Sequence, residues 1–174
     1  SVYGAHREQM DILRKKGLDF EVVPGVSSFC AAAAALKAEY TLPNVSQSVI
    51  ITRMEGRTPV PERQKIADYA EHGATMVIFL SSGMTEKLSQ ELIAGGYKAD
   101  TPAAIVYKAS WPDEKVVHCT VGTLAEAAAA NNISNLALIT VGGFLGNEYE
   151  RSELYNPGFS HGFRQASAPK EAAK

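Results

Sequence analysis

Hydrophobic and polar residues alternate along residues 48–141 in a pattern that predicts strands separated by helices. Five short apolar runs, rich in β-branched residues, are typical of buried strands and occupy residues 48–52, 75–80, 103–107, 115–120 and 136–141. Helical patterns lie between them at residues 61–71, 84–94 and 123–130. The connection at residues 108–114 is short, which predicts a hairpin and therefore an antiparallel pair. We expect an α/β domain with a mixed five-stranded sheet flanked by helices.

Several residues mark where these helices begin and end. Pro61 occupies the first position of one helix, and Gly95 and Gly96 follow the next. Thr123 and Glu126 have the spacing of a capping box, in which each satisfies a backbone N–H near the other.

The residues before Glu39 predict one strand between two helices. These elements are a helix at residues 5–16 followed by Gly17, a strand at 20–23 and a helix at 30–38. Ser27 or Ser28 is expected to cap the second helix through its hydroxyl group. One strand cannot form a sheet alone, so we interpret this part as the end of a larger α/β domain.

The expected domain organisation has four parts. Residues 39–47 contain a proline, an asparagine and short polar residues, which indicates a linker. The parts are the end of an N-terminal α/β domain at 1–38, the linker at 39–47, a C-terminal α/β domain at 48–146 and a loosely attached tail at 147–174. The chain begins at Ser1 rather than at Met, and we interpret it as the later part of a longer protein.

Composition narrows the possible partners. The 174 residues include 17 basic and 19 acidic side chains, a net charge of −2, which argues against nucleic-acid or anionic-membrane binding. No apolar run approaches the roughly 18 residues of a transmembrane helix. The four histidines lack the spacing of metal ligands, and Cys30 and Cys119 form no Cys-x-x-Cys motif, so we expect no metal site. Because the two cysteines also indicate no disulfide framework, we expect two buried thiols and a cytoplasmic location.

A candidate binding turn follows the predicted strand at residues 20–23. Pro24 and Gly25 end this strand, and Ser27 and Ser28 precede the next helix, a position where α/β sheets commonly bind ligands. An ordinary serine-capped turn has the same local pattern. However, the order of Tyr3-Gly4, helix, strand and Pro24-Gly25 resembles the tetrapyrrole methylases.

This resemblance implies two α/β domains with S-adenosylmethionine bound in the cleft between them, S-adenosylhomocysteine as product, and a homodimer. The cofactor-binding positions that it implies in this sequence are Val2, Ser27, Ser28, Leu80 and Ala109. Leu80 and Ala109, taken singly, are better explained by plain core packing, and only the pattern of the whole chain points to a cofactor role.

Two further segments are similar to one subfamily, the precorrin-4 C11-methyltransferases of cobalamin biosynthesis. They are Thr52-Arg53-Met54-Glu55-Gly56-Arg57-Thr58-Pro59-Val60-Pro61-Glu62 and Val106-Tyr107-Lys108-Ala109-Ser110-Trp111-Pro112-Asp113-Glu114-Lys115. Guanidinium groups suit a substrate with many carboxylates, and the expected substrate-binding residues are Tyr3, Arg53, Arg57 and Lys108. The alternatives are surface ion pairs among Arg53, Glu55 and Arg57, and a hairpin loop whose Trp111 covers an edge of the core, a structural role that can coexist with binding.

The resemblance therefore implies a S-adenosylmethionine-dependent C-methyltransferase acting on C11 of precorrin-4 or cobalt-precorrin-4. No residue is identified as a catalytic acid or base, and family members have Gly-Asp-Pro directly before the position of Ser1, so activity of this chain alone stays open. Two alternatives remain: another tetrapyrrole methylase, such as a uroporphyrinogen-III C-methyltransferase, and a non-catalytic dimerisation module. Binding tests with cofactor and with corrinoid would separate them.

Overall fold

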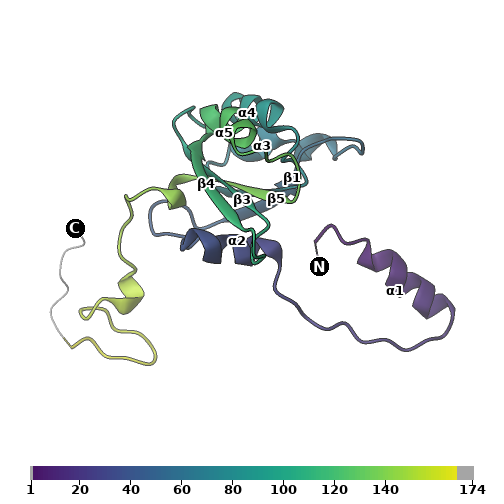
Figure 1. Ribbon diagram of the computed structural model, residues 1–174. Coiled ribbons are helices and arrows are strands. Elements are labelled where there is room, and N and C mark those ends of the chain that lie inside the picture. The colour runs from purple at the N-terminus through teal and green to yellow at the C-terminus, as the bar shows by residue number, and fades with distance from the viewer. Residues whose placement is uncertain (1, 168–174) are drawn as a thin grey trace.

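A five-stranded mixed sheet forms the centre of the molecule (Figure 1). The computed structural model describes residues 2–167. The strands are β1 (Val49–Arg53), β2 (Thr75–Phe79), β3 (Pro102–Tyr107), β4 (Lys115–Thr120) and β5 (Ala137–Val141), in the spatial order β1-β2-β5-β3-β4. The predicted mixed sheet and its five strands are confirmed.

Strand directions bring several chain segments to one edge of this sheet. β1 and β2 are parallel, whereas β5 runs antiparallel to both β2 and β3, and β3 pairs with β4 as a hairpin. Arg53 lies opposite Phe79, and Tyr107 lies opposite Ala137. The carboxyl ends of β1, β2 and β3 therefore meet the amino end of β5, and we call this the carboxyl edge.

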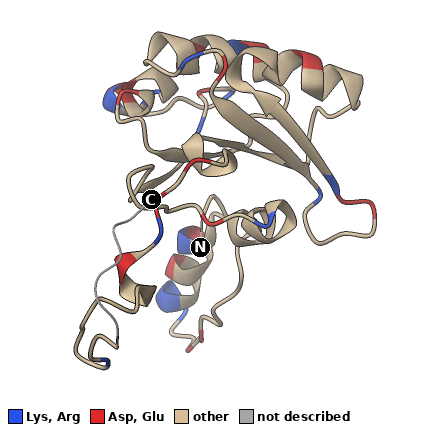
Figure 2. Ribbon diagram, turned by 90° about the vertical axis from the view of Figure 1, so that its left-hand side faces the viewer, with Lys and Arg blue, Asp and Glu red and all other residues tan. Residues whose placement is uncertain are grey.

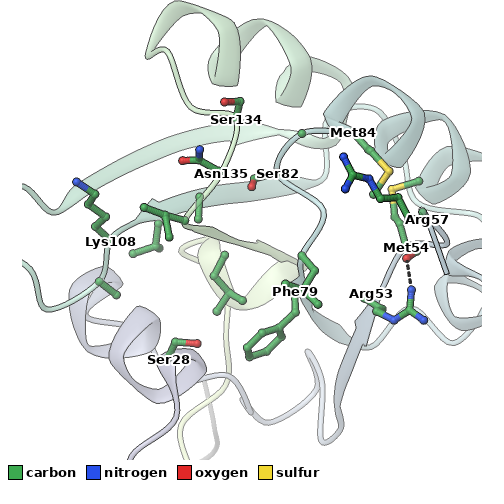
Figure 3. A pocket seen from close by; sticks show the side chains of 18 of the residues that line it. Ser28, Arg53, Met54, Arg57, Phe79, Ser82, Met84, Lys108, Ser134 and Asn135 are labelled. Atoms are coloured by element: carbon green, nitrogen blue, oxygen red, sulfur yellow. Dashed lines mark hydrogen bonds between the residues drawn. The ribbon is translucent and has the colours of Figure 1, made fainter. Parts of the chain in front are cut away.

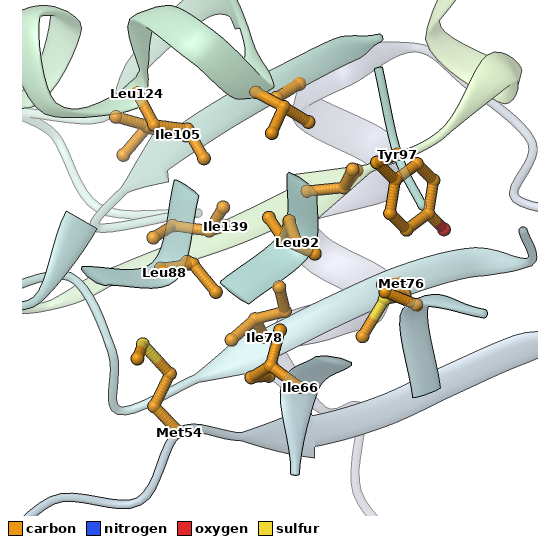
Figure 4. Close-up of a cluster of buried hydrophobic side chains, with 14 of the residues drawn as sticks. Met54, Ile66, Met76, Ile78, Leu88, Leu92, Tyr97, Ile105, Leu124 and Ile139 are labelled. Carbon is orange, nitrogen blue, oxygen red and sulfur yellow. The ribbon is translucent and has the colours of Figure 1, made fainter. Parts of the chain in front are cut away.

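Three helices cover one face of the sheet. They are α3 (Ile66–Ala70), α4 (Thr85–Ala94) and α5 (Leu124–Ala130). The buried side chains between them and the sheet form the main core (Figure 4), which includes Ile66, Leu88, Leu92, Leu124, Ile78, Ile105 and Ile139. Burial of aliphatic groups of this size stabilises a fold by about 1.5–3 kcal/mol each, so this face supplies most of the stability.

Helix α2 (Ser28–Leu36) covers the opposite face. Its Ala32 is fully buried in a second cluster with Tyr40 and Phe144, against Val77 and Val106 of the sheet. The Tyr40 hydroxyl also donates a 2.7 Å hydrogen bond to the Phe29 carbonyl. The predicted helix at residues 30–38 is confirmed with shifted bounds, and the predicted boundary at residues 39–47 stays a prediction.

Helix α1 (His6–Lys15) forms as expected but has no buried residue. It lies apart from the sheet in Figure 1, and Figure 2 shows that basic and acidic residues both occur along it. Asp11 pairs with Arg7 at 3.1 Å and with Arg14 at 2.8 Å, an arrangement that supports an exposed helix locally.

The predicted strand at residues 20–23 is wrong, because these residues are extended without strand pairing. A strand needs a neighbouring strand to satisfy its backbone groups, and the described part of the chain places none beside this segment. The Val22 and Val23 side chains are consequently exposed.

Three predicted helix boundaries also differ. The segment at 61–71 forms a short turn, η1 (Glu62–Gln64), and then α3, because Lys65 between them is extended. Thr123 makes no capping box with Glu126; its hydroxyl instead accepts the Thr120 N–H at 2.9 Å, which closes the preceding turn η2 (Val121–Thr123). Neither serine caps α2 by a side-chain hydrogen bond, since Ser27 at the cap position makes none and Ser28 is the first helical residue.

The chain leaves the sheet through η3 (Gly143–Leu145) and turns back on itself around η4 (Glu153–Tyr155). Arg164 donates from Nη2 to the carbonyl oxygens of Leu154 at 2.9 Å and Asn156 at 2.7 Å. The expectation of two buried thiols is wrong, because Cys30 is exposed on α2 while Cys119 is half-buried. Within residues 2–167, every helix is too short or too polar to cross a membrane.

Candidate functional site

A cavity of about 820 Å³ opens at the carboxyl edge of the sheet (Figure 3). Its walls are the loops that follow β1, β2 and β3, the segment that precedes β5, and Ser28 at the start of α2. Ligand sites of α/β proteins lie at such edges because loops from neighbouring strands converge there.

Six of the nine predicted site residues line this cavity. They are Ser28, Leu80 and Ala109 from the cofactor set and Arg53, Arg57 and Lys108 from the substrate set. Tyr3 lies nearby, with its ring 5.6 Å from that of Phe79, a residue of the cavity wall. Val2 and Ser27 are outside the lining, and the roles of all nine residues stay predictions.

Arg53, at the end of β1, is bonded to the loop that follows it. Its Nη1 donates to the carbonyl oxygens of Met54 at 3.0 Å and Thr58 at 3.2 Å. Its Nη2 donates to the Pro59 carbonyl at 2.8 Å. One guanidinium group thus joins both ends of the loop at residues 54–59.

Ser81 fixes the same loop to the next strand. Its hydroxyl group is fully buried, accepts the Met54 N–H at 3.0 Å and donates to the Phe79 carbonyl at 2.7 Å. These two hydrogen bonds therefore join the ends of β1 and β2, in addition to the backbone hydrogen bonds that pair the two strands.

Arg57 lies in the middle of this loop and is exposed. In Figure 3 its guanidinium group extends beside Met54 and Met84 at the cavity. Among the described residues it has no hydrogen-bond or ion-pair partner, and the alternative of ion pairs among Arg53, Glu55 and Arg57 is not formed. Arg57 is consequently available to an anionic group of a ligand.

Lys108, directly after β3, has a partner of its own. Its ammonium group bonds Asp113 and lies about 5 Å from the ring centres of Tyr107 and Trp111. The hydrogen bond to Asp113 raises the pKa of Lys108, and the same bond lowers the pKa of Asp113. Trp111 lines the cavity and is exposed, and it is not among the residues packed against either hydrophobic cluster.

Three residues of the wall have a left-handed backbone, which non-glycine residues rarely adopt. Leu80 follows β2 with φ of 53°, Lys108 follows β3 with φ of 47°, and Leu136 precedes β5 with φ of 51°. Such conformations cost on the order of 1–3 kcal/mol each and concentrate at functional sites. The side chains of Leu80 and Leu136 are 68% and 60% exposed, so core packing does not explain them.

Comparison with known proteins agrees with this architecture. The model of the family "Tetrapyrrole (Corrin/Porphyrin) Methylases" matches residues 1–125. The chain belongs to the tetrapyrrole methylases.

Individual relatives make the likeness more specific. The chain is 52% identical to the cobalt-precorrin-4 C(11)-methyltransferase of Methanocaldococcus jannaschii and 48% identical to that of Priestia megaterium, in each case over 95% of this chain. It covers 64% and 66% of those relatives, so it spans slightly less than two thirds of their length. A solved cobalt precorrin-4 methyltransferase has a TM-score of 0.81 and 51% identity, with 83% of this chain and 60% of that chain covered.

The cavity of this tetrapyrrole methylase also contains residues that sequence reasoning missed. They include Met54, Phe79, Ser82, Met84, Ser134, Asn135 and Leu136. Ser134, Asn135 and Leu136 precede β5, whose antiparallel direction brings its amino end to the carboxyl edge. The sequence does show a short polar stretch before the last buried strand. However, only the order and direction of the strands in the sheet place this stretch at the cavity.

Proposed function

We propose that this chain is part of a S-adenosylmethionine-dependent methyltransferase that modifies C11 of cobalt-precorrin-4 in cobalamin biosynthesis. The observation that carries the proposal is the likeness to relatives of that name, at 52% and 48% identity. Identity is 42% to the precorrin-4 C(11)-methyltransferase of Pseudomonas aeruginosa and 28% to the uroporphyrinogen-III C-methyltransferase of Bacillus subtilis. This order favours C11 methylation and a cobalt-containing substrate.

The cavity fits the methyl donor in size and chemistry. Its volume lies within the range of about 300–1,000 Å³ of small-molecule sites, and its wall combines apolar side chains with a few polar groups. In the proposal the donor is held by Val2, Ser27, Ser28, Leu80 and Ala109. A Thermus thermophilus relative with 24% identity, a uroporphyrin-III C-methyl transferase, is described as a complex with S-adenosyl homocysteine.

When bound, S-adenosylmethionine supplies an activated methyl group with a neutral leaving group. The protein then has to orient the two reactants and exclude water. Apolar Leu80 and Leu136 at the cavity wall suit the exclusion of water, and the guanidinium group of Arg57 suits a carboxylate of the macrocycle.

The proposal includes the biological setting. We place the protein in the cytoplasm as a homodimer, with residues 1–38 and 48–146 belonging to two α/β domains. The exposed apolar side chains of Val22, Val23 and Val26 support the proposal that residues 1–38 pack against a further part of the protein.

Calorimetric titration with S-adenosylhomocysteine tests the cofactor site. We expect saturable binding to this chain and its loss in Ala109→Phe, whose ring would fill the cavity. Ala94→Phe, at an exposed position on α4, is the matched control and should bind like the unchanged chain. Absence of binding to the unchanged chain, or equal binding to both variants, would contradict the proposed site.

Incubation of this chain with S-adenosylmethionine and cobalt-precorrin-4 tests whether it carries out the reaction. The expected product carries one additional methyl group, detected by mass spectrometry and located on C11 by NMR. Uroporphyrinogen III offered in competition should remain unmodified. Methylation of uroporphyrinogen III instead would support the less similar relative's activity.

A further inference from the structure

The three basic residues of the cavity wall differ in how their charges are used. Arg53 bonds three backbone carbonyls, Lys108 bonds Asp113, and Arg57 has no partner among residues 2–167. We infer that Arg53 does not bind the substrate but positions Arg57, which alone anchors a substrate carboxylate. This inference rests on the proposed function and deepens it, because it assigns different roles to two arginines that the sequence made equivalent.

The contacts of Arg53 support a positioning role. Three of its five N–H groups already donate to backbone carbonyls at 2.8–3.2 Å, so fewer donors remain for a carboxylate than on Arg57. The carbonyl oxygens come from Met54 at the start of the loop and from Thr58 and Pro59 at its end. A lysine could not reproduce this arrangement, since it lacks the planar fork of a guanidinium group.

The loop that Arg53 closes has Arg57 near its tip. Gly56 and Thr58 flank Arg57, and the Gly56 N–H approaches the Thr58 carbonyl at 3.4 Å, which is a weak bond. At the base, the Met54 N–H bonds the buried Ser81 hydroxyl. The loop therefore has a rigid start, and the Arg53 guanidinium fixes its other end.

The lack of a partner distinguishes Arg57 as the anchor. An exposed guanidinium with free donors can bind a carboxylate bidentately, whereas the charge of Lys108 is balanced by Asp113 in the same hairpin. Free movement of the loop would raise the entropic cost of that bond. Arg53 thus increases substrate affinity through Arg57.

A double-mutant cycle measures whether the two arginines act together. Uroporphyrin III, a stable tetrapyrrole polycarboxylate, is titrated into the unchanged chain, Arg53→Ala, Arg57→Ala and the double variant. We expect Arg57→Ala to weaken binding about tenfold or more, Arg53→Ala to weaken it less, and the double variant to match Arg57→Ala. Losses that multiply in the double variant would show that Arg53 contacts the ligand itself and would overturn the inference.

Arg53→Lys separates charge from geometry. A residue that attracts the substrate by charge alone would be replaced well by lysine, so recovery of wild-type affinity would also overturn the inference. We expect Arg53→Lys to bind as weakly as Arg53→Ala. Arg63→Ala, an exposed arginine in η1, is the matched control and should retain affinity.

Hydrogen exchange provides a test that needs no ligand. Arg53→Ala and Arg53→Lys should both accelerate exchange of the Gly56 amide, which bonds the Thr58 carbonyl, while Arg57→Ala should leave it unchanged. Unaltered exchange in both Arg53 variants would refute the positioning role even if the chain bound no tetrapyrrole. Failure of the unchanged chain to bind uroporphyrin III, with the expected exchange pattern, would instead count against the proposed substrate.

Discussion

Leu136 combines an unfavourable backbone conformation with an exposed apolar side chain. Its φ of 51° strains a residue that carries a Cβ atom, and 60% of its surface is accessible, so the side chain contributes little to the core. Glycine removes the steric cost but increases the entropy of the unfolded chain. We expect Leu136→Gly to change the free energy of unfolding by less than about 1 kcal/mol, as measured in urea.

The same substitution is expected to weaken S-adenosylhomocysteine binding, because it removes an apolar part of the cavity wall. Calorimetric titration of the variant checks this. A large loss of stability with unchanged affinity would mean that Leu136 serves packing and not the ligand.

Ser81 is a residue whose hydroxyl group has two backbone partners. Ser81→Ala leaves the buried Met54 N–H without an acceptor, which costs about 1–3 kcal/mol. Urea unfolding should show this loss. Ser82→Ala is a matched control at the next position, because Ser82 is also buried but makes no hydrogen bond through its side chain in the described structure, and a similar loss in both variants would contradict the assignment.

At the scale of elements, the close contact between α3 and α4 depends on Gly95. A Cβ atom at this position would lie 2.5 Å from the Ala70 side chain and closer still to the Ala67 carbonyl oxygen. Because that neighbour is backbone, the helices would have to separate, and we expect Gly95→Ala to destabilise the fold by about 1–3 kcal/mol in urea unfolding. Gly25→Ala, where no atom lies within 4 Å, should be neutral; equal effects would refute the packing argument.

The elements also show what sequence patterns could predict. Apolar runs identified every strand of the sheet because each of these runs contributes apolar side chains to the two clusters on the faces of the sheet, whereas the run at 20–23 is also mostly apolar but has no pairing strand in the described structure. Arg53 and Arg57 were indistinguishable in sequence, since their difference comes from three carbonyl contacts of the folded loop. Asn135 was missed because its place at the cavity follows from the antiparallel direction of β5.

At the scale of the whole molecule, the cluster on each face of the sheet contains one tyrosine whose hydroxyl donates a hydrogen bond to a backbone carbonyl. The Tyr97 hydroxyl, after α4, donates to the Ala74 carbonyl before β2, and the Tyr40 hydroxyl donates to the Phe29 carbonyl in α2. Burial raises the pKa of each tyrosine from 10.0 to about 12, and burial raises the pKa of Cys119 from 9.0 to about 11. In all three groups the folded protein thus favours the protonated form.

These shifts determine the sign of an alkaline effect. Between the lower and the higher pKa of each group, the unfolded chain releases a proton that the folded chain retains, so unfolding becomes more favourable as pH rises. We expect the free energy of unfolding in urea to be unaffected by these groups below about pH 9 and to fall progressively from there towards pH 11–12. In Tyr97→Phe the stability should be lower at neutral pH but should decline less steeply between pH 10 and 12, because one of the three titrating groups is removed. A slope unchanged by this substitution would show that Tyr97 titrates alike in both states, and would contradict a proton held on the buried Tyr97 hydroxyl by the folded protein.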